Sequence, residues 1–483
     1  MIVSFIWRRD NNVLKAISFE RELKKIIYDI REYGIRELEK TNEIININDS
    51  TKDSFIQNVH YGFYRAQDVS IHLLTRVITD KKKKKRALKQ AKVENHKDKI
   101  KEYEFEINLL EFWEAVVRKA MDSLAWIIFK YDDTSLRRFF KGDENIDITD
   151  SNLDSEKRFV QKHKQENPLD FVLINDLTTF MQVGDIVITS PNQQITIAEL
   201  KEGQANEIVL EAIPHLKNAT GTEEMFDIYR DVPEKLKKQM RRDLKQMMRM
   251  SQVEKVINTG KGLDLFSKLE TSIINEPVLT MSSYEDVIDF LINDSTKKGY
   301  ALDLLDGCLY IGVYTSEWIR KDLAYRKLKN IERKSSFEEW ICNNKVKGKI
   351  VDFRQTIMWP GTFPLYLHSF SANQIMDIIF GRTVILLAFD MNSWMRFLSE
   401  NGIYYEILSQ KSSSRIKGKI DNKNILVDEG GLISLWKSNR EKKVIIGNGL
   451  YSRLYCEMYT PRSIARIYSR LVELNDIHSE EFY

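Results

Sequence analysis

An acid and an acid–lysine pair occupy two adjoining apolar stretches of the segment GDIVITSPNQQITIAELKE, residues 184–202. The alternation of Ile, Val and Thr predicts two strands, and a three-residue loop at 191–193 would join them as a hairpin. In that register Asp185 directly opposes Glu199, with Cβ atoms about 4.5–5.5 Å apart on one face of the sheet. Lys201 lies two residues beyond Glu199 and therefore points to the same face.

Two opposed carboxylates repel each other, so a compensating charge is expected. A divalent cation held by both acids and by the backbone carbonyl of Leu200 would polarise a phosphodiester and lower the pKa of a bound water. Lys201 would then orient that water or stabilise charge on the pentavalent phosphate. The alternative is a surface ion pair worth less than about 1 kcal/mol. Ile195 and Ile197 share the face of Glu199, which indicates a strand covered on both sides and favours the metal site.

The composition limits what kind of protein this is. With 483 residues, 42% hydrophobic and 30% charged, we expect a soluble protein of two or three domains. No apolar run approaches the roughly 18 residues of a membrane span, and no signal peptide is recognisable, so we expect a cytoplasmic protein without a membrane partner. The three cysteines are widely spaced and read as buried small hydrophobes, and the seven histidines show no ligand spacing. Any metal would need oxygen ligands, which indicates Mg²⁺ or Mn²⁺.

Charge is unevenly distributed along a chain whose net charge is only +3. The N-terminal region 1–102 shows helical periodicity and contains a basic segment, 81–101, with eleven Lys or Arg against two acids. This segment lacks Gly and Pro, so it fits either a solvent-facing helix or a nucleic-acid contact. Because the rest of the chain is mildly acidic, the asymmetry indicates a polyanionic partner.

Helices are predicted on both sides of the hairpin. An amphipathic helix ends near Asp132, a polar acidic loop follows at 142–157, and three strands are expected within 168–203. A second amphipathic helix is expected over 234–257. Helix, strands and helix in this order indicate a compact α/β unit.

The second helix carries a line of basic side chains that could contact phosphates. Its members are Lys235, Lys238, Arg242, Lys245 and Arg249. The alternative is the solvated face of an amphipathic helix. Beyond it the chain mixes helices and strands without a recognisable motif. We therefore expect a helical N-terminal region (1–102), the site domain (103–262) and a mixed α/β C-terminal region of unknown role (263–483).

The residues of the hairpin resemble the PD-(D/E)XK nuclease superfamily, also called restriction-endonuclease-like, over about 110–255. The resemblance rests on Asp185 and on Glu199-Leu200-Lys201 between two helices. It implies a multidomain α/β (α+β) protein with an αβββαβ core and magnesium-dependent cleavage of DNA or, less often, RNA. It also implies that Asp185 is the first metal ligand, Glu199 the second and Lys201 the catalytic lysine.

Many members of the superfamily add an acid from the preceding helix. Asp122 is the first candidate for it and Glu114 the second, because both lie with Arg118 on one polar line. A glutamine shortly after the lysine, as some members have, would be Gln204. The sequence departs from the common pattern at Gly184, where a proline is usual.

The function implied is a magnesium-dependent nuclease, a DNA endonuclease rather than one for RNA, in prokaryotic antiphage defence or restriction. One alternative is a catalytically silent domain that binds nucleic acid or protein in a larger complex. Another is a toxin-like nuclease restrained by a partner. A homo-oligomer and a partner protein of a defence system both stay open.

Overall fold

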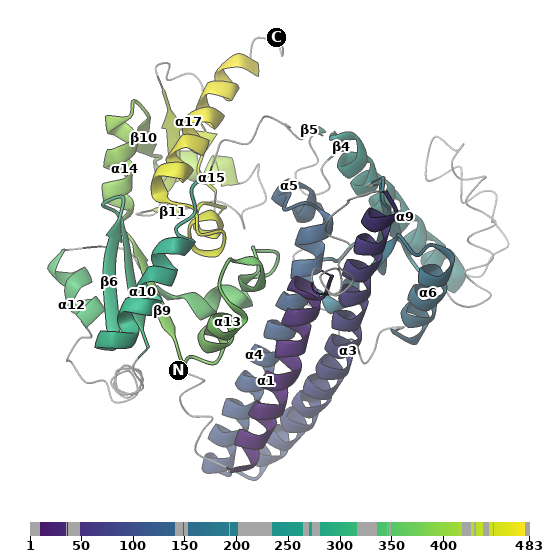
Figure 1. Ribbon diagram of the computed structural model, residues 1–483. Coiled ribbons are helices and arrows are strands. Elements are labelled where there is room, and N and C mark those ends of the chain that lie inside the picture. Colours follow the sequence, from purple (N-terminus) through teal and green to yellow (C-terminus); the bar gives the residue numbers. More distant parts are fainter. Residues whose placement is uncertain are drawn as a thin grey trace. The chain divides into compact units, whose positions relative to one another are not determined.

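The structure is a computed structural model of mixed α/β architecture (Figure 1). It describes residues 10–34, 36, 49–140, 148, 153–192, 194–200, 234–263, 270–272, 281–315, 336–344, 346, 349–417, 427–428, 431–437, 444–447 and 449–478. Among these residues, no helix is both long enough and apolar enough to cross a membrane.

The chain forms two compact units that interleave along the sequence. Unit 1 comprises Met1–Glu32, Asp68–Ser123 and Asn275–Tyr483, and unit 2 comprises Tyr33–Gln67 and Leu124–Ile274. The long helices α3 (Asp49–Val93) and α4 (Lys97–Ile128) contribute to both units. The sequence predicted three consecutive domains, whereas these two units are each made of separate chain segments. The three-domain division stays a prediction.

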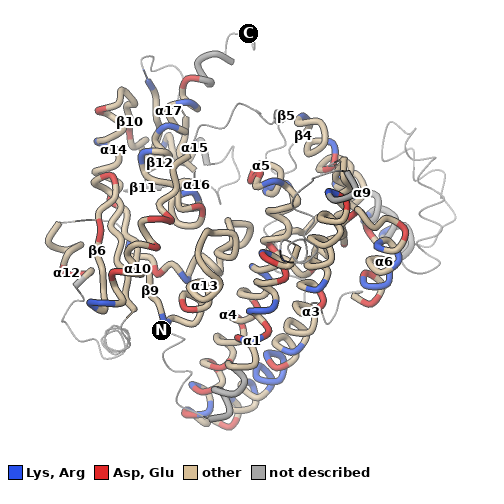
Figure 2. Tube along the Cα trace, viewed as in Figure 1, with Lys and Arg blue, Asp and Glu red and all other residues tan. Residues whose placement is uncertain are grey.

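The basic segment 81–101 is helical, as one of its two interpretations predicted. It forms the end of α3, where Lys and Arg recur along the helix, and the start of α4 (Figure 2). Within unit 1, four of its lysines form ion pairs with acids of α4. The four pairs that connect the two helices are Lys81–Glu114, Lys84–Glu106, Lys85–Glu111 and Lys92–Glu104. Lysine numbers rise while glutamate numbers broadly fall, so the helices run antiparallel. The charges of these four lysines are therefore already compensated by glutamates of the same protein.

Unit 1 also contains the N-terminal helix α1 (Asp10–Arg31) and two sheets. The first sheet is antiparallel, in the order β6 (Tyr300–Leu305), β7 (Leu309–Tyr314), β9 (Val384–Phe389), β8 (Ile350–Asp352). The second contains β10 (Tyr404–Ile407), β12 (Gly431–Trp436), β11 (Val427–Asp428) and β13 (Val444–Ile445). The longer helices here are α10 (Glu285–Lys298), α12 (Ser336–Asn343), α13 (Ala372–Ile379), α14 (Met391–Glu400), α15 (Gln410–Lys417) and α17 (Pro461–His478).

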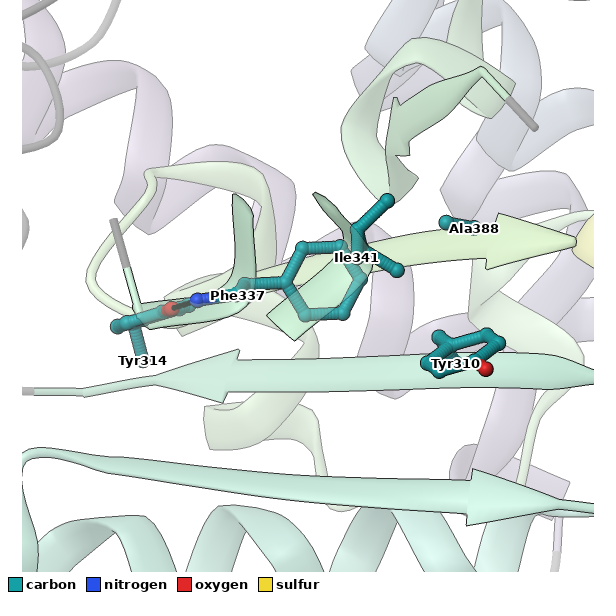
Figure 3. Close-up of a cluster of buried hydrophobic side chains, with 5 residues drawn as sticks. All are labelled: Tyr310, Tyr314, Phe337, Ile341 and Ala388. Atoms are coloured by element: carbon teal, nitrogen blue, oxygen red, sulfur yellow. Dashed lines mark hydrogen bonds between the residues drawn. The ribbon is translucent and has the colours of Figure 1, made fainter. Parts of the chain in front are cut away.

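Helix α12 packs on the first sheet through a buried apolar cluster (Figure 3). Its members are Tyr310, Tyr314, Phe337, Ile341 and Ala388. The Phe337 amide donates a hydrogen bond of 3.1 Å to the Tyr314 hydroxyl. A Cβ at Gly312 would lie 2.6 Å from the Phe337 ring, so the absence of a side chain there lets the helix approach the sheet. Of the cysteines, Cys308 and Cys456 are buried as expected, but Cys342 on α12 is exposed, and that expectation was wrong.

Unit 2 carries the predicted hairpin. Its sheet is the antiparallel meander β1 (Phe171–Ile174), β2 (Ile186–Thr189), β3 (Ile195–Ala198). Helix α6 (Leu153–Glu166) packs on β1 and helix α9 (Glu234–Thr259) on β3. Strand β4 (Lys261–Leu263) follows α9 but pairs with β5 (Glu270–Ser272) in a sheet of its own.

The element order α6–β1–β2–β3–α9–β4 has the predicted sequence of types, with two differences. The helix before the strands is α6, not the helix that ends near Asp132, and α6 begins inside the segment 142–157 that was expected to be a loop. The last strand lies outside the three-stranded sheet. Three strands and the following helix, α9, are confirmed.

Candidate functional site

The register of the hairpin is the one predicted. Ile186 pairs with Ala198 and Thr189 with Ile195, so Asp185 and Glu199 are the next residues beyond the ladder. The Asp185 amide donates to the Ala198 carbonyl at 2.9 Å. Strand β3, however, is an edge strand of this sheet and only alternate residues are buried, so the expectation of cover on both faces was wrong.

The Asp185 side chain turns toward the end of β3. Its Oδ2 accepts a hydrogen bond of 2.6 Å from the Leu200 amide. A charge-assisted bond to a backbone amide holds a carboxylate in one orientation. The Asp185 carboxylate is therefore fixed at the end of β3, where Glu199 directly precedes Leu200.

Gly184 is required by the turn that introduces Asp185. Its φ is +75°, which proline cannot adopt and other L-residues adopt at a cost. A Cβ there would lie 2.6 Å from Ile197 Cγ2 and 2.9 Å from the Ala198 carbonyl oxygen. The departure from the proline of the superfamily pattern thus has a local physical cause.

Asn175 holds the same turn from the other side. It is buried after β1, and its Nδ2 donates to the carbonyls of Val183 and Gly184, each at 3.0 Å. Its backbone amide donates to the Asp185 carbonyl at 2.9 Å. Three hydrogen bonds from one residue fix the path of the chain into β2.

Glu156 on α6 is the acid whose surroundings include both predicted ligands. Its side chain is 2% exposed, and among the described residues its Oε2 has no hydrogen-bond partner. Burial, together with the negative charges of Asp176, Asp185 and Glu199, raises the pKa of Glu156 to about 8. Glu156 on α6 thus feels the charges of three acids, one from the turn after β1 and two that flank the hairpin strands.

Helix α9 contacts the other side of this group. Gln246 donates a hydrogen bond from Nε2 to Glu199 Oε2. Met250 and Val253, further along the helix, are buried. Arg242 and Arg249 lie four residues before and three after Gln246, so they project on the side of α9 that faces Glu199. Two basic residues therefore share the side of α9 on which Gln246 contacts Glu199.

The donor set suits a cation that prefers oxygen, such as Mg²⁺ or Mn²⁺. A buried carboxylate oxygen without a partner, surrounded by like charges, is stabilised by a divalent cation. In the described part of the chain, no three His, Cys, Asp or Glu side chains already surround one point at ligand distances. The carboxylates thus match such an ion in the chemistry of their oxygen atoms, but among the described residues no three of them are placed to hold one.

The residues predicted on the hairpin, just after it and on α9 fall into three groups. Asp185, Glu199 and Leu200 meet in unit 2. Lys201 and Gln204 lie outside the described residues, and so does the side chain of Lys235. Of the basic line, three side chains are exposed and that of Arg249 is partly buried; the exposed ones are Lys238, Arg242 and Lys245.

Asp122 and Glu114 have local partners in unit 1. Asp122 is fully buried and forms an ion pair of 3.4 Å with Lys119. Glu114 accepts hydrogen bonds from Lys81 and Arg118. A metal-binding role of either acid stays a prediction, whereas Glu156 lies in the same unit as the hairpin.

Sequence reasoning missed Glu156, Asp176, Asn175 and Gln246. One signal for Glu156 was present: it lies between Leu153 and Val160, at helical spacing, on what little apolar stripe α6 has. An acid at such a position must be buried when the helix packs. Asn175 and Gln246 left no signal, because only the fold brings them to the hairpin.

Comparison of the chain with protein-family models, with curated proteins and with solved structures finds no match. The function must therefore be inferred from the geometry of unit 2.

Proposed function

We propose that unit 2 is a magnesium-dependent nuclease of the PD-(D/E)XK type that hydrolyses phosphodiester bonds, as a DNA endonuclease in prokaryotic defence or restriction. The observation that carries the proposal is the burial of Glu156, with an unpartnered oxygen, beside Asp185 and Glu199. A buried acid close to acids of other elements serves no packing purpose, because burying a carboxylate near like charges costs free energy.

In this proposal Glu156, Asp185 and Glu199 hold the cation. A bound Mg²⁺ would act as a Lewis acid on the phosphodiester and would lower the pKa of a water ligand. The protein's own residues position the ligands: the Leu200 amide orients Asp185 and Gln246 orients Glu199. Lys201 keeps its predicted role of stabilising charge on the phosphate.

The basic side chains of α9 supply the second part of the proposal. Arg242 and Arg249 flank Gln246, and Lys238 and Lys245 are exposed on the same helix. Cations in a line beside a carboxylate site attract a phosphate backbone and offset the repulsion between the acids and the nucleic acid.

The test is cleavage of supercoiled plasmid, single-stranded DNA and RNA with Mg²⁺, with EDTA, and by variants of the site. Glu156→Gln, Glu199→Ala and Lys201→Ala should each lower the rate at least about 100-fold, as removal of metal ligands or charge stabilisers does. Glu166→Gln, an exposed acid at the other end of α6, is the matched control. Cleavage that persists in Glu199→Ala would rule out this site.

A second candidate function is a silent nuclease-like domain that binds nucleic acid. It is favoured by the finding that, in the described residues, no three potential ligands already enclose a metal position. Calorimetric titration with Mn²⁺ separates the two: saturable binding that Glu156→Gln and Glu199→Ala abolish supports the nuclease. Tight nucleic-acid binding without Mn²⁺ binding or cleavage supports the silent domain.

A further inference from the structure

A cluster of tyrosines and basic residues lies on unit 2, between α3 and the C-terminal end of α6. Lys164 Nζ lies 4.5 Å from the ring centre of Tyr61 and 4.9 Å from that of Tyr64. Tyr61 is 5.6 Å from Tyr33, and the Arg65 guanidinium lies 4.8 Å above the Tyr33 ring. We call these five residues the aromatic-basic strip.

The strip contains one buried, hydrogen-bonded tyrosine and two exposed residues. Tyr64 is buried, and its hydroxyl donates to the Asp170 carbonyl at 3.2 Å and accepts from the Val172 amide at 3.1 Å. Tyr61 keeps 44% of its surface exposed, and Arg65 is also exposed. The exposed part of the Tyr61 ring, beside the Lys164 ammonium, is therefore accessible to a ligand.

Two elements lead from the strip to the carboxylates. On α6, Lys164 follows Glu156 by eight residues, about 12 Å along the helix axis. Strand β1 begins beside Tyr64 and ends at Ile174, directly before Asn175 and Asp176. Because α6 packs on β1, both elements run from the aromatic-basic strip to the carboxylates. The distance of about 12 Å along α6 corresponds to about four stacked nucleotides at roughly 3.4 Å each.

We propose that the aromatic-basic strip binds unpaired bases of a single-stranded nucleic acid whose backbone continues to the carboxylate group; this rests on the proposed nuclease function. Aromatic side chains stack on the face of any base, and Lys or Arg beside them bind the phosphates. A duplex keeps its bases stacked inside, so it cannot offer them to Tyr61. The substrate class is therefore DNA or RNA with a single-stranded segment.

The experiment measures binding apart from cleavage. Fluorescence anisotropy of the full-length Glu199→Ala protein in EDTA is recorded with labelled single-stranded DNA, with RNA of the same length, with blunt duplex DNA and with an abasic oligonucleotide. Tighter binding of either single strand than of the duplex and the abasic strand supports the proposal, and the better of the two identifies the sugar preferred. Equal binding of the abasic and the base-containing strands overturns it.

Variants then place the binding on the strip. Tyr61→Ala should weaken single-strand binding roughly tenfold and change duplex binding less than about twofold, as loss of one stacked base does. Lys164→Gln should weaken both. Tyr404→Ala, a tyrosine of unit 1 that is 51% exposed, is the matched control. Unchanged single-strand affinity in a folded Tyr61→Ala protein overturns the proposal even if the protein is a nuclease, and loss of cleavage alone leaves it standing.

Discussion

At the scale of single residues, Gly184 allows a sharp test of how the turn serves the site. A side chain there meets both a positive φ and close approaches to Ile197 and Ala198. We expect Gly184→Ala to lower the free energy of unfolding by about 2–4 kcal/mol, of which about 1–2 kcal/mol comes from the left-handed backbone alone. Because Asp185 follows directly, cleavage should also fall.

The control is Gly307→Ala. Gly307 has a φ of +70°, but a Cβ there would meet nothing within 4 Å. In urea denaturation, Gly307→Ala should therefore lose less free energy of unfolding than Gly184→Ala, and its cleavage rate should be unchanged. Equal losses in the two variants would contradict a role for the close packing around Gly184.

At the scale of elements, the hairpin was predictable and α6 was not. A period of two and a short loop leave one register that buries Ile195 and Ile197, so the pairing of β2 with β3 follows from local pattern alone. Helix α6 has few apolar residues, and most of its surface is polar. Its position depends on packing against β1, which no local pattern encodes. The candidate site was therefore predicted on the hairpin and missed on the helix.

We expect the basic residues of α3 and those of α9 to contribute differently to nucleic-acid binding. The lysines of α3 that pair with α4 should contribute little to it, because their charges are already compensated. Replacing Arg242, Lys245 and Arg249 of α9 with Gln should weaken binding across all sequences. The slope of log K against log salt should become shallower by about 0.7–0.9 for each phosphate that the variant no longer neutralises.

The comparison variant replaces Lys84, Lys85 and Lys92 of α3 with Gln. Its salt slope should match that of the unmodified protein, and its free energy of unfolding should fall by about 0.2–1 kcal/mol per pair at low salt. A reduced slope in this variant would show that α3, and not only α9, binds the phosphate backbone.

At the scale of the whole molecule, unit 1 joins distant parts of the chain through buried polar groups. Lys119 of α4 donates hydrogen bonds to the carbonyls of Trp359 at 2.8 Å and Thr362 at 2.7 Å, and it is paired with Asp122. We expect Lys119→Met to lower the free energy of unfolding in urea by about 3–5 kcal/mol, because it removes the ammonium that forms an ion pair with the buried Asp122 carboxylate.

The double variant Lys119→Met/Asp122→Leu should recover part of that loss. The double variant also separates the two roles of Asp122. If Asp122 only pairs with Lys119, the double variant should recover stability and cleave at the normal rate. Rescue of stability with cleavage abolished would instead support Asp122 as a metal ligand.

A second pair, between buried His368 and partly exposed Glu285, should determine how far the stability of the fold persists at acid pH. Glu285 of α10 accepts hydrogen bonds from His368 at 2.7 Å and from the Ser369 amide at 2.7 Å, and the other ring nitrogen of His368 faces the Cys456 carbonyl at 2.8 Å. Both ring nitrogens thus face oxygen atoms. Burial alone would raise the pKa of Glu285, but the bonds and charge of His368 and Ser369 outweigh it and lower the pKa to about 2.

Because the folded-state pKa of Glu285 lies below its ordinary value of 4.5, its contribution is complete above pH 4.5 and is lost as the pH falls toward 2. The shift corresponds to at most about 3 kcal/mol, and solvent screening of the partly exposed carboxylate reduces that value. Urea denaturation between pH 6 and pH 2 should show a shallower loss of stability for Glu285→Gln than for the unmodified protein, from a lower starting value. Asp286→Asn, next to it on the exposed side of α10, should leave the slope unchanged. Parallel curves for Glu285→Gln and the unmodified protein would mean that other carboxylates set the acid limit.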